Sequence, residues 1–202
     1  MNRLSRSQAS LLATVLIAVL LVIGAALRYK GFLSLPVFMN LVDDNAFLGI
    51  AAIGMTFVIL SGGIDLSVGS MIGFTSIASA LLVERAQYHP LLASALVLIA
   101  GAAFGLFQGF LIARFEIAPF LVTLAGMFFL RGAAYSLSLE SIALTNPAYE
   151  ALDSLRIPLG TTSLPATGLL FVVVAIAAIF LAGQTRFGRG VYAIGGNANS
   201  AR

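Results

Sequence analysis

The sequence lacks cysteine, has one histidine and one lysine, and carries charge on only 9% of its 202 residues. Without cysteine the chain has no disulfide, no thiolate metal site and no cysteine nucleophile. The single histidine, His89, leaves little scope for a histidine-based metal or catalytic cluster. With Lys30 as its one lysine the chain has no GxxxxGK(S/T) phosphate loop, and the GxSxG and HExxH patterns are also missing. We therefore expect no ATP hydrolysis and no covalent catalysis by this chain, and no bound cofactor.

Apolar length is what the chain has in abundance. Hydrophobic residues make up 60% of it and the mean hydropathy is +1.04, whereas an ordinary soluble domain is about a quarter charged. A helix that crosses a bilayer needs roughly 20 apolar residues. Such stretches recur, once one long run is divided in two, at residues 9–27, 46–61, 66–83, 91–113, 117–139 and 164–183. The sequence predicts an all-α polytopic membrane helix bundle with about six transmembrane helices.

Basic residues indicate the orientation, because they are scattered in ones and twos rather than gathered into a patch for nucleic acid. With the N-terminus inside, the inner segments hold six of them, at positions 3, 6, 114, 186, 189 and 202, and the outer segments hold four, at positions 28, 30, 85 and 156. We predict that the N-terminus and the tail both face the cytoplasm. The first apolar run resembles a signal peptide but is longer than a cleavable one, so we expect an anchor that stays.

The most informative segment is the block LSGGIDLSVGS at residues 60–70. Two glycines after Ser61 weaken a helix and permit positive φ, so we expect one helix to end near Ser61 and another to begin near Leu66. Irregular backbone and a carboxylate at membrane depth are tolerated only where protein or water satisfies them. Asp65 is therefore either an N-cap of the following helix or part of a break that lines a solute path, where it hydrogen-bonds the freed amides or faces the path. The two roles are compatible at a cytoplasmic mouth.

Other residues within the apolar runs leave their roles open. Arg131 either pairs with a carboxylate, snorkels to the outer interface or contacts a solute. Glycines at positions 101, 105 and 109 recur every fourth residue and predict a face for close helix packing. Gln108 and Asn45 would hydrogen-bond either a neighbouring helix or a solute hydroxyl.

The tail, residues 184–202, is too short and too polar to span a membrane. It mixes aromatic anchors, basic side chains and turn glycines, as expected of a short helix presented to a partner at the membrane face. On composition alone, a frayed basic tail is an equally good description.

Three separated blocks, in this order, resemble the membrane permeases of bacterial ABC importers for ribose and related monosaccharides. They are AAIGMTFVILSGGIDLSVGS at residues 51–70, PFLVTLAGM at residues 119–127, and TRFG followed by AIGGN within residues 185–197. Residues 44–50, 127–132 and 140–142 are similar to the galactofuranose permease branch of that family. The resemblance spans nearly the whole chain from Asn40 onward.

The resemblance implies a permease subunit that moves a monosaccharide, galactofuranose or a ribose-like sugar, across the bacterial cytoplasmic (inner) membrane. The implied partners are ABC ATPase subunits that use the ATP, a second permease subunit that is the same or homologous, a periplasmic sugar-binding protein and membrane lipid. Nucleic acid is not among them. Carried onto this sequence, the resemblance implies a translocation pathway shaped by Asn45, Ser61, Gly62, Gly63, Asp65 and Ser67. It implies ATPase coupling through Thr185, Arg186, Phe187, Gly188, Tyr192, Gly195, Gly196 and Asn197.

Members of this family are longer than 202 residues and continue past the Gly-Gly-Asn block into further membrane helices. We expect residues 1–202 to be a single transmembrane permease domain, the N-terminal part of a longer family domain, with residues 184–202 as its cytoplasmic coupling segment. Two other functions stay open. One is a secondary transporter that uses Asp65 and Arg131 as a relay, against which the lack of internal repeats and the single histidine argue. The other is a non-transporting membrane fragment.

Overall fold

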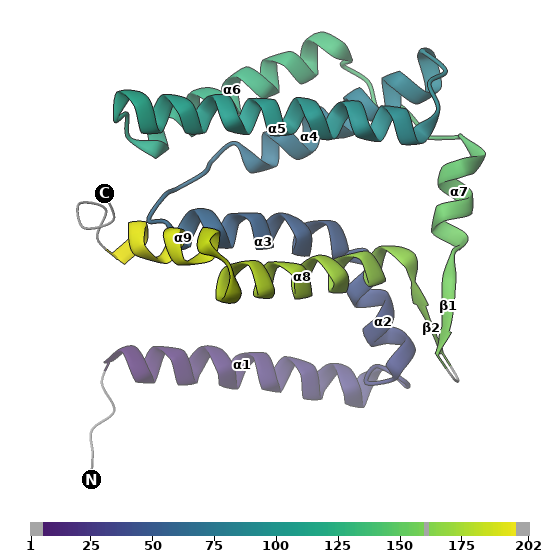
Figure 1. The fold of residues 1–202 in the computed structure, drawn as a ribbon. Helices are drawn as coiled ribbons and strands as arrows, with labels where there is room; N and C mark the ends of the chain where they lie inside the picture. The colour runs from purple at the N-terminus through teal and green to yellow at the C-terminus, as the bar shows by residue number, and fades with distance from the viewer. Residues whose placement is uncertain (1–5, 160–161, 197–202) are drawn as a thin grey trace.

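The computed structural model describes residues 6–159 and 162–196, and helices dominate it (Figure 1). Each of the six apolar runs contains a helix, so the all-α membrane bundle is confirmed. In chain order the elements are α1 (Arg6–Arg28), α2 (Leu35–Asp44), α3 (Ala46–Leu60), α4 (Val68–Ala80), the π-helix η1 (Leu81–Arg85), α5 (Pro90–Phe115), α6 (Pro119–Leu137), α7 (Pro147–Ser154), β1 (Arg156–Leu159), β2 (Thr162–Pro165), α8 (Ala166–Gln184) and α9 (Arg186–Gly196).

Local sequence explains where several of these helices begin. Proline occupies the first position of α5, α6 and α7. Proline has no backbone N–H, and at this position an N–H would have no partner within the helix. His89 caps α5, since its Nδ1 accepts a hydrogen bond from Leu91 N at 3.3 Å. Asn146 caps α7 in the same way, because its Oδ1 accepts from Ala148 N at 3.0 Å. Each start is therefore encoded within three residues.

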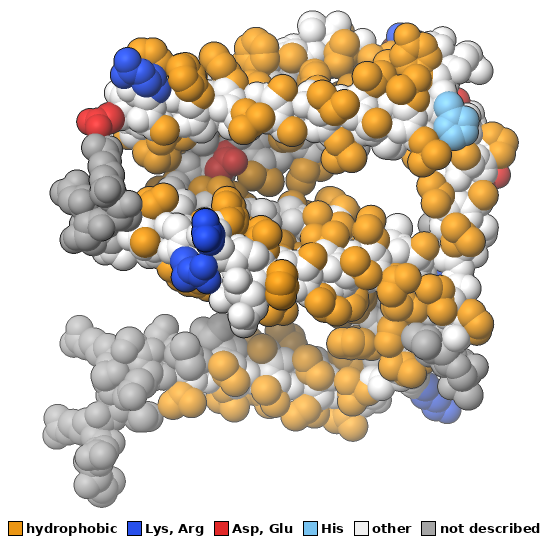
Figure 2. All heavy atoms as spheres, in the orientation of Figure 1, with side chains coloured by type: hydrophobic (Ala, Val, Ile, Leu, Met, Phe, Trp, Pro, Cys, Tyr) orange, Lys and Arg blue, Asp and Glu red, His pale blue; other side chains and the backbone are white. Residues whose placement is uncertain are grey.

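Apart from α1 and α7, the helices form two groups (Figure 1). α4, α5 and α6 pack on one another, while α3 packs on α8 and α9, with α2 beside α8. Residues 61–67 link the groups at one end, and α7 with the β-hairpin links them at the other (Figure 1). The space-filling view shows an opening between the groups (Figure 2). The two groups therefore meet chiefly through their connecting segments.

The start of α1 and helix α9 lie at one side of the molecule, and α7 with the hairpin lies at the opposite side (Figure 1). Large apolar side chains cover the outer surfaces of the helices (Figure 2). The buried apolar core of the described chain is small, with Val83, Ala93 and Leu130 among its members. Such a surface suits lipid, where the solvent is itself apolar and helices need not bury their hydrophobic faces.

Three helices within the described residues, α5, α6 and α8, are long and apolar enough to cross a membrane. The pair α2 and α3, bent by 59°, would make a fourth span. The helix break leaves α3 with 15 residues and α4 with 13, and the described side chains of α1 form a shorter apolar stretch over Leu12–Arg28. By length and composition the bundle thus has three to four spans, and the count of six stays a prediction.

The hydrophilic stretch between α6 and α8 holds regular structure of its own. It contains α7 and an antiparallel hairpin in which Arg156 pairs with Pro165 and Ile157 pairs with Leu164. The strands have four residues each, too few for an alternating pattern to be recognised.

The first glycine of the ladder in α5 packs against α4. A Cβ at Gly101 would lie 3.7 Å from the Met71 sulfur of α4, as close packing requires. Cβ atoms at Gly105 and Gly109 would meet nothing within 4 Å in the described chain, so close packing at these two glycines stays a prediction.

Candidate functional site

The predicted break after α3 is a Schellman-type helix end. Gly63 N donates a hydrogen bond to the Val58 carbonyl (2.9 Å), and Gly62 N donates to the Ile59 carbonyl (2.9 Å). Gly62 has φ 80°, the left-handed conformation that this motif requires. The Ser61 hydroxyl also donates to Val58 O, at 2.8 Å. The break at residues 61–63 is thereby confirmed, and carbonyls at the end of α3 have hydrogen-bond partners within the chain.

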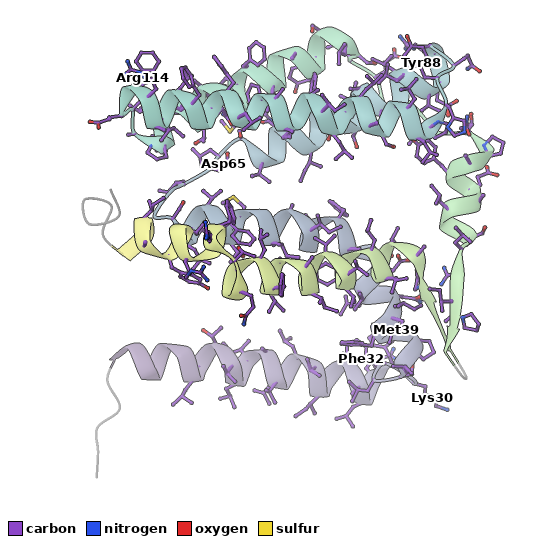
Figure 3. The ribbon with its side chains drawn as sticks, viewed as in Figure 1. Lys30, Phe32, Met39, Asp65, Tyr88 and Arg114 are labelled. Atoms are coloured by element: carbon purple, nitrogen blue, oxygen red, sulfur yellow. The ribbon has the colours of Figure 1, made fainter. Side chains whose placement is uncertain are left out.

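Asp65 lies on the non-helical link that follows (Figure 3). Its Oδ1 accepts hydrogen bonds from the Ser67 backbone N–H (2.7 Å) and from the Ser67 hydroxyl (2.7 Å). Asp65 is therefore not the N-cap of α4, a position that Ser67 occupies, but it satisfies the amide just before the helix. α4 begins at Val68 rather than near Leu66, because the carboxylate holds Ser67 in a turn.

Ser67 connects Asp65 to α5. Its Oγ lies 3.3 Å from Gln108 Oε1, and both side chains are buried. The hydroxyl has one proton, which it gives to Asp65, so an oxygen of Gln108 facing it would be left without a donor. In that orientation Gln108 Nε2 is also buried without a partner. Turning the amide lets Nε2 donate to Ser67 Oγ and creates a chain of hydrogen bonds from Gln108 through Ser67 to the carboxylate.

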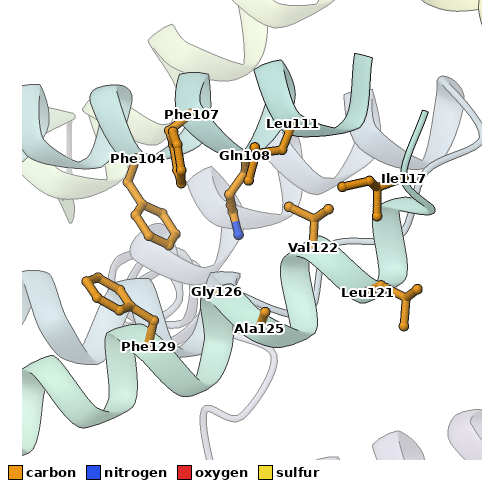
Figure 4. A pocket seen from close by; sticks show the side chains of 10 residues that line it. All are labelled: Phe104, Phe107, Gln108, Leu111, Ile117, Leu121, Val122, Ala125, Gly126 and Phe129. Atoms are coloured by element: carbon orange, nitrogen blue, oxygen red, sulfur yellow. The ribbon is translucent and has the colours of Figure 1, made fainter. Parts of the chain in front are cut away.

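The Gln108 side chain reaches from α5 toward α6 beside an apolar pocket of about 510 Å³ (Figure 4). Its amide lies so close to Gly126 that a Cβ there would overlap it. The rings of Phe104 and Phe129 stack at the same pocket, with centroids 5.9 Å apart. Gln108 is therefore a contact between helices. Of the two roles that the sequence leaves open for it, the structure favours packing against a neighbouring helix over contact with a solute.

Thr123 ties α6 to the same link. Its hydroxyl lies 3.1 Å from the Ile64 carbonyl and 2.9 Å from the Pro119 carbonyl, and the side chain is only 4% exposed. The sequence does not single out Thr123, whose one signal is a hydroxyl within an apolar run. Residues 61–67 are thus held by buried polar groups from both α5 and α6.

Thr185 sets the turn from α8 into α9. Its hydroxyl donates to Leu181 O (2.6 Å) and accepts a hydrogen bond from Gly188 N (3.2 Å), so Thr185 is the N-cap of α9. A Cβ at Gly188 would overlap the Ala182 carbonyl oxygen of α8. Glycine is therefore needed at this position for the sharp reversal between the two helices.

α9 packs on the broken end of α3. The Phe187 ring contacts Phe57 of α3, with centroids 5.7 Å apart. A Cβ at Gly195 would overlap the carbonyl oxygen of Leu60, the last residue of α3. The structure thus brings the segment predicted to couple to a partner into contact with the segment predicted to shape a path.

The remainder of α9 is available to a partner. Phe187, Tyr192 and Ile194 are each about half exposed, at 56%, 52% and 50%, and Arg186 and Arg189 are exposed beside them. Aromatic and arginine side chains on one exposed helix are typical of protein interfaces.

Some predicted site residues do not join this cluster. Asn45 lies at the other end of α3, where its Nδ2 donates to Leu41 O at 2.8 Å. The 15-residue helix α3, roughly 22 Å long, separates it from Ser61. Asn197 lies outside the described residues. Arg131 makes no hydrogen bond or ion pair within the described chain, so the pairing with a carboxylate is not formed there.

A second polar cluster lies at the side of the molecule that carries α7. The Glu84 carboxylate accepts hydrogen bonds from Thr145 N (2.7 Å), the Thr145 hydroxyl (2.8 Å) and Asn146 N (3.0 Å). These bonds, the hydroxyl bond first, hold the pKa of Glu84 below its usual value. No group of three or more His, Asp or Glu residues that would hold a metal ion occurs in the described residues.

Residues 37–202 match the protein family described as branched-chain amino acid transport system / permease component. The chain belongs to this family. Its apolar helices and family place it as a multi-pass protein of the inner membrane, as the sequence predicts. No solved structure matches the chain.

Three relatives show the range of similarity. The chain is 56% identical over 176 residues to the inner membrane ABC transporter permease protein YjfF of Escherichia coli (strain K12), covering 86% of this chain and 53% of the relative. It is 34% identical to the fructose import permease protein FruG of Bifidobacterium longum (strain NCC 2705), over 98% of this chain and 60% of the relative. It is 33% identical to the ribose import permease protein RbsC of Escherichia coli (strain K12), over 93% of this chain and 59% of the relative. The chain spans between about half and three fifths of the length of these relatives.

Proposed function

We propose that the chain forms part of the membrane permease of an ATP-driven importer for a monosaccharide. The relatives named for fructose and ribose import support a sugar as the solute. A ribose-like sugar is favoured by these names, and galactofuranose is favoured only by the resemblance of residues 44–50, 127–132 and 140–142. The observation that carries the proposal is the contact of α9 with the broken end of α3.

This contact offers a mechanical route from a cytoplasmic partner to the membrane. An ATPase that grips the exposed Phe187, Tyr192 and arginines of α9 would move the helix. Gly195 lies directly on the Leu60 carbonyl, so the movement would be passed to the Schellman end of α3 and to the Asp65 link. Broken helices of this kind are suited to gating, because a short irregular link bends at lower cost than a continuous helix.

The partners in this proposal are ATPase subunits at α9, a second permease subunit, and a sugar-binding protein that delivers the solute from outside. The chain's own residues supply no nucleotide-binding loop, so the energy would come from the ATPase.

The test is uptake of radiolabelled ribose, fructose, xylose and leucine by cells that carry the complete gene and its transport partners, with the deletion strain as baseline. ATP-driven import predicts sugar uptake that persists with a protonophore and stops when cellular ATP is depleted. Uptake that follows the proton gradient and is abolished by Asp65→Asn would instead support the secondary transporter. Leucine uptake without sugar uptake would overturn the proposal that the solute is a monosaccharide.

Two single-methyl variants of α9 test the route. Gly195→Ala places a Cβ on the Leu60 carbonyl and should reduce uptake strongly, whereas Gly190→Ala on the same helix meets nothing within 4 Å in the described chain. Equal uptake by the two variants, at equal protein levels in the membrane, would exclude α9 packing on α3 as the coupling contact.

A further inference from the structure

A second cavity, of about 480 Å³, lies between α4 and α6 on the side of Asp65 that leads toward α7. Its volume is within the range of small-molecule sites. One wall is the face of α4 that carries Gly69, Ser70 and Gly73, and the other is the face of α6 that carries Arg131 and Tyr135. Leu66 of the link that follows the break also lines the cavity, and α9 does not.

Glycines give this cavity its depth. Gly69 and Gly73 are four residues apart and share one face of α4. A Cβ at either position would meet nothing within 4 Å in the described chain, so side chains there would fill the cavity rather than clash with protein. The space exists because these residues have no side chain.

The polar groups of the cavity have unused hydrogen-bonding capacity. Arg131 and Tyr135 are also four residues apart and share one face of α6. Within the described chain, the Arg131 guanidinium, the Tyr135 hydroxyl and the Glu140 carboxylate form no hydrogen bond or ion pair. A guanidinium offers five N–H donors and a carboxylate offers only acceptors, so the cavity presents both kinds of group to a ligand.

The end of α6 is shaped so that Glu140 reaches the cavity. The Ser138 hydroxyl donates to Glu140 O (2.9 Å) and accepts a hydrogen bond from Glu140 N (3.3 Å). These two hydrogen bonds fix the backbone directly after α6, and both Glu140 and Ser141 line the cavity. The carboxylate therefore comes from a turn fixed by hydrogen bonds.

These groups select a neutral ligand rich in hydroxyls. The charges of Arg131 and Glu140 cancel, so the cavity has no net attraction for an anion or a cation. Each sugar hydroxyl both donates and accepts, which matches the N–H donors of Arg131 and the acceptor oxygens of Glu140. The Tyr135 ring offers an apolar face to the C–H groups of a sugar ring and a hydroxyl at its edge. We propose that this cavity is a monosaccharide-binding subsite of the permease, an inference that rests on the proposed function.

Direct binding is measurable by tryptophan fluorescence, because residues 1–202 hold no tryptophan and the unaltered complex supplies the background. Tyr135→Trp adds a reporter in the cavity, and Phe128→Trp adds one on an exposed position of α6 that does not line it. The detergent-solubilised complex is titrated with D-ribose, D-fructose, D-xylose and L-leucine. A saturable fluorescence change at Tyr135→Trp alone, with a sugar but not with leucine, is expected. A response to leucine alone would show that the cavity binds a zwitterion instead of a sugar. No response to any of the four compounds would overturn the proposed subsite.

Transport then separates this inference from the proposed function. Gly73→Leu fills the cavity, while Gly132→Leu adds the same side chain to open space on α6 outside it. We expect Gly73→Leu to lower sugar uptake about tenfold or more, as overpacking a fitted site does, and Gly132→Leu to retain it. Sugar uptake that is equal in the two variants would overturn the subsite and leave the importer standing. The absence of sugar uptake in the unaltered protein would overturn the importer itself.

Discussion

At the scale of single residues, the contact between Gln108 and Gly126 makes the sharpest prediction. A methyl group at position 126 would overlap the Gln108 amide, which is itself buried. Gly126→Ala should therefore lower the free energy of unfolding by about 1–3 kcal/mol through overpacking. Shortening the opposing side chain with Gln108→Ala should restore much of the loss, since the two substitutions act on the same space. Thermal unfolding in detergent measures both variants and their combination.

Gly132→Ala is the matched control, because it lies on the same helix with nothing within 4 Å of its Cβ in the described chain. It should be neutral or slightly stabilising, as alanine is favoured over glycine in a helix. Additive effects of Gly126→Ala and Gln108→Ala would show that the two residues do not share a contact.

At the scale of elements, the end of α3 depends on one backbone conformation. Gly62 has φ 80°, whereas Gly69 is the second residue of α4 and does not have a positive φ. Gly62→Ala should cost about 1–2 kcal/mol, the penalty of a left-handed conformation for a residue with a Cβ. Gly69→Ala should not destabilise the protein. The measurement is the unfolding temperature of the two variants, and a Gly62→Ala protein as stable as Gly69→Ala would mean that the link relaxes into another conformation.

How much of these elements the sequence predicts depends on the range of the interactions involved. The break at residues 61–63 was predictable because a pair of glycines acts locally on φ. The sequence predicts the start of α4 two residues early, since propensity does not reveal which amide the Asp65 carboxylate binds. The contact of Gly195 with Leu60 is not predictable, because it joins helices far apart in sequence. Its only signal in the sequence is a glycine. The same holds for Thr123 and Ile64.

At the scale of the whole molecule, Glu84 fastens η1 to the segment that leads into α7. Its pKa is lowered in the folded chain, so the contribution of its three hydrogen bonds is fully present above the carboxyl's usual pKa. That contribution is lost as the pH falls through the lowered value. Proteolytic cleavage near Thr145 should therefore speed up on acidification. At neutral pH the protease should cleave the Glu84→Gln variant faster than the unaltered chain. The cleavage rate of this variant should change little with pH, because the glutamine side chain has no proton to gain. A mutant profile that still follows pH would assign the effect to another group.

The orientation of the whole molecule decides whether α9 is able to meet an ATPase at all. Tyr88 and Arg114 mark opposite ends of α5, and α9 lies at the end that carries Arg114 (Figures 1 and 3). Since the chain has no cysteine, single-cysteine variants give clean labelling. A membrane-impermeant maleimide should label Tyr88→Cys and Leu152→Cys from outside, and should label Arg114→Cys and Arg189→Cys only after the membrane is opened. The reverse pattern would place α9 outside, where no ATP is available, and would end the coupling role of Gly195. Labelling of Leu152→Cys and Arg189→Cys from the same side would mean that α8 does not cross the membrane, although its composition suits a span.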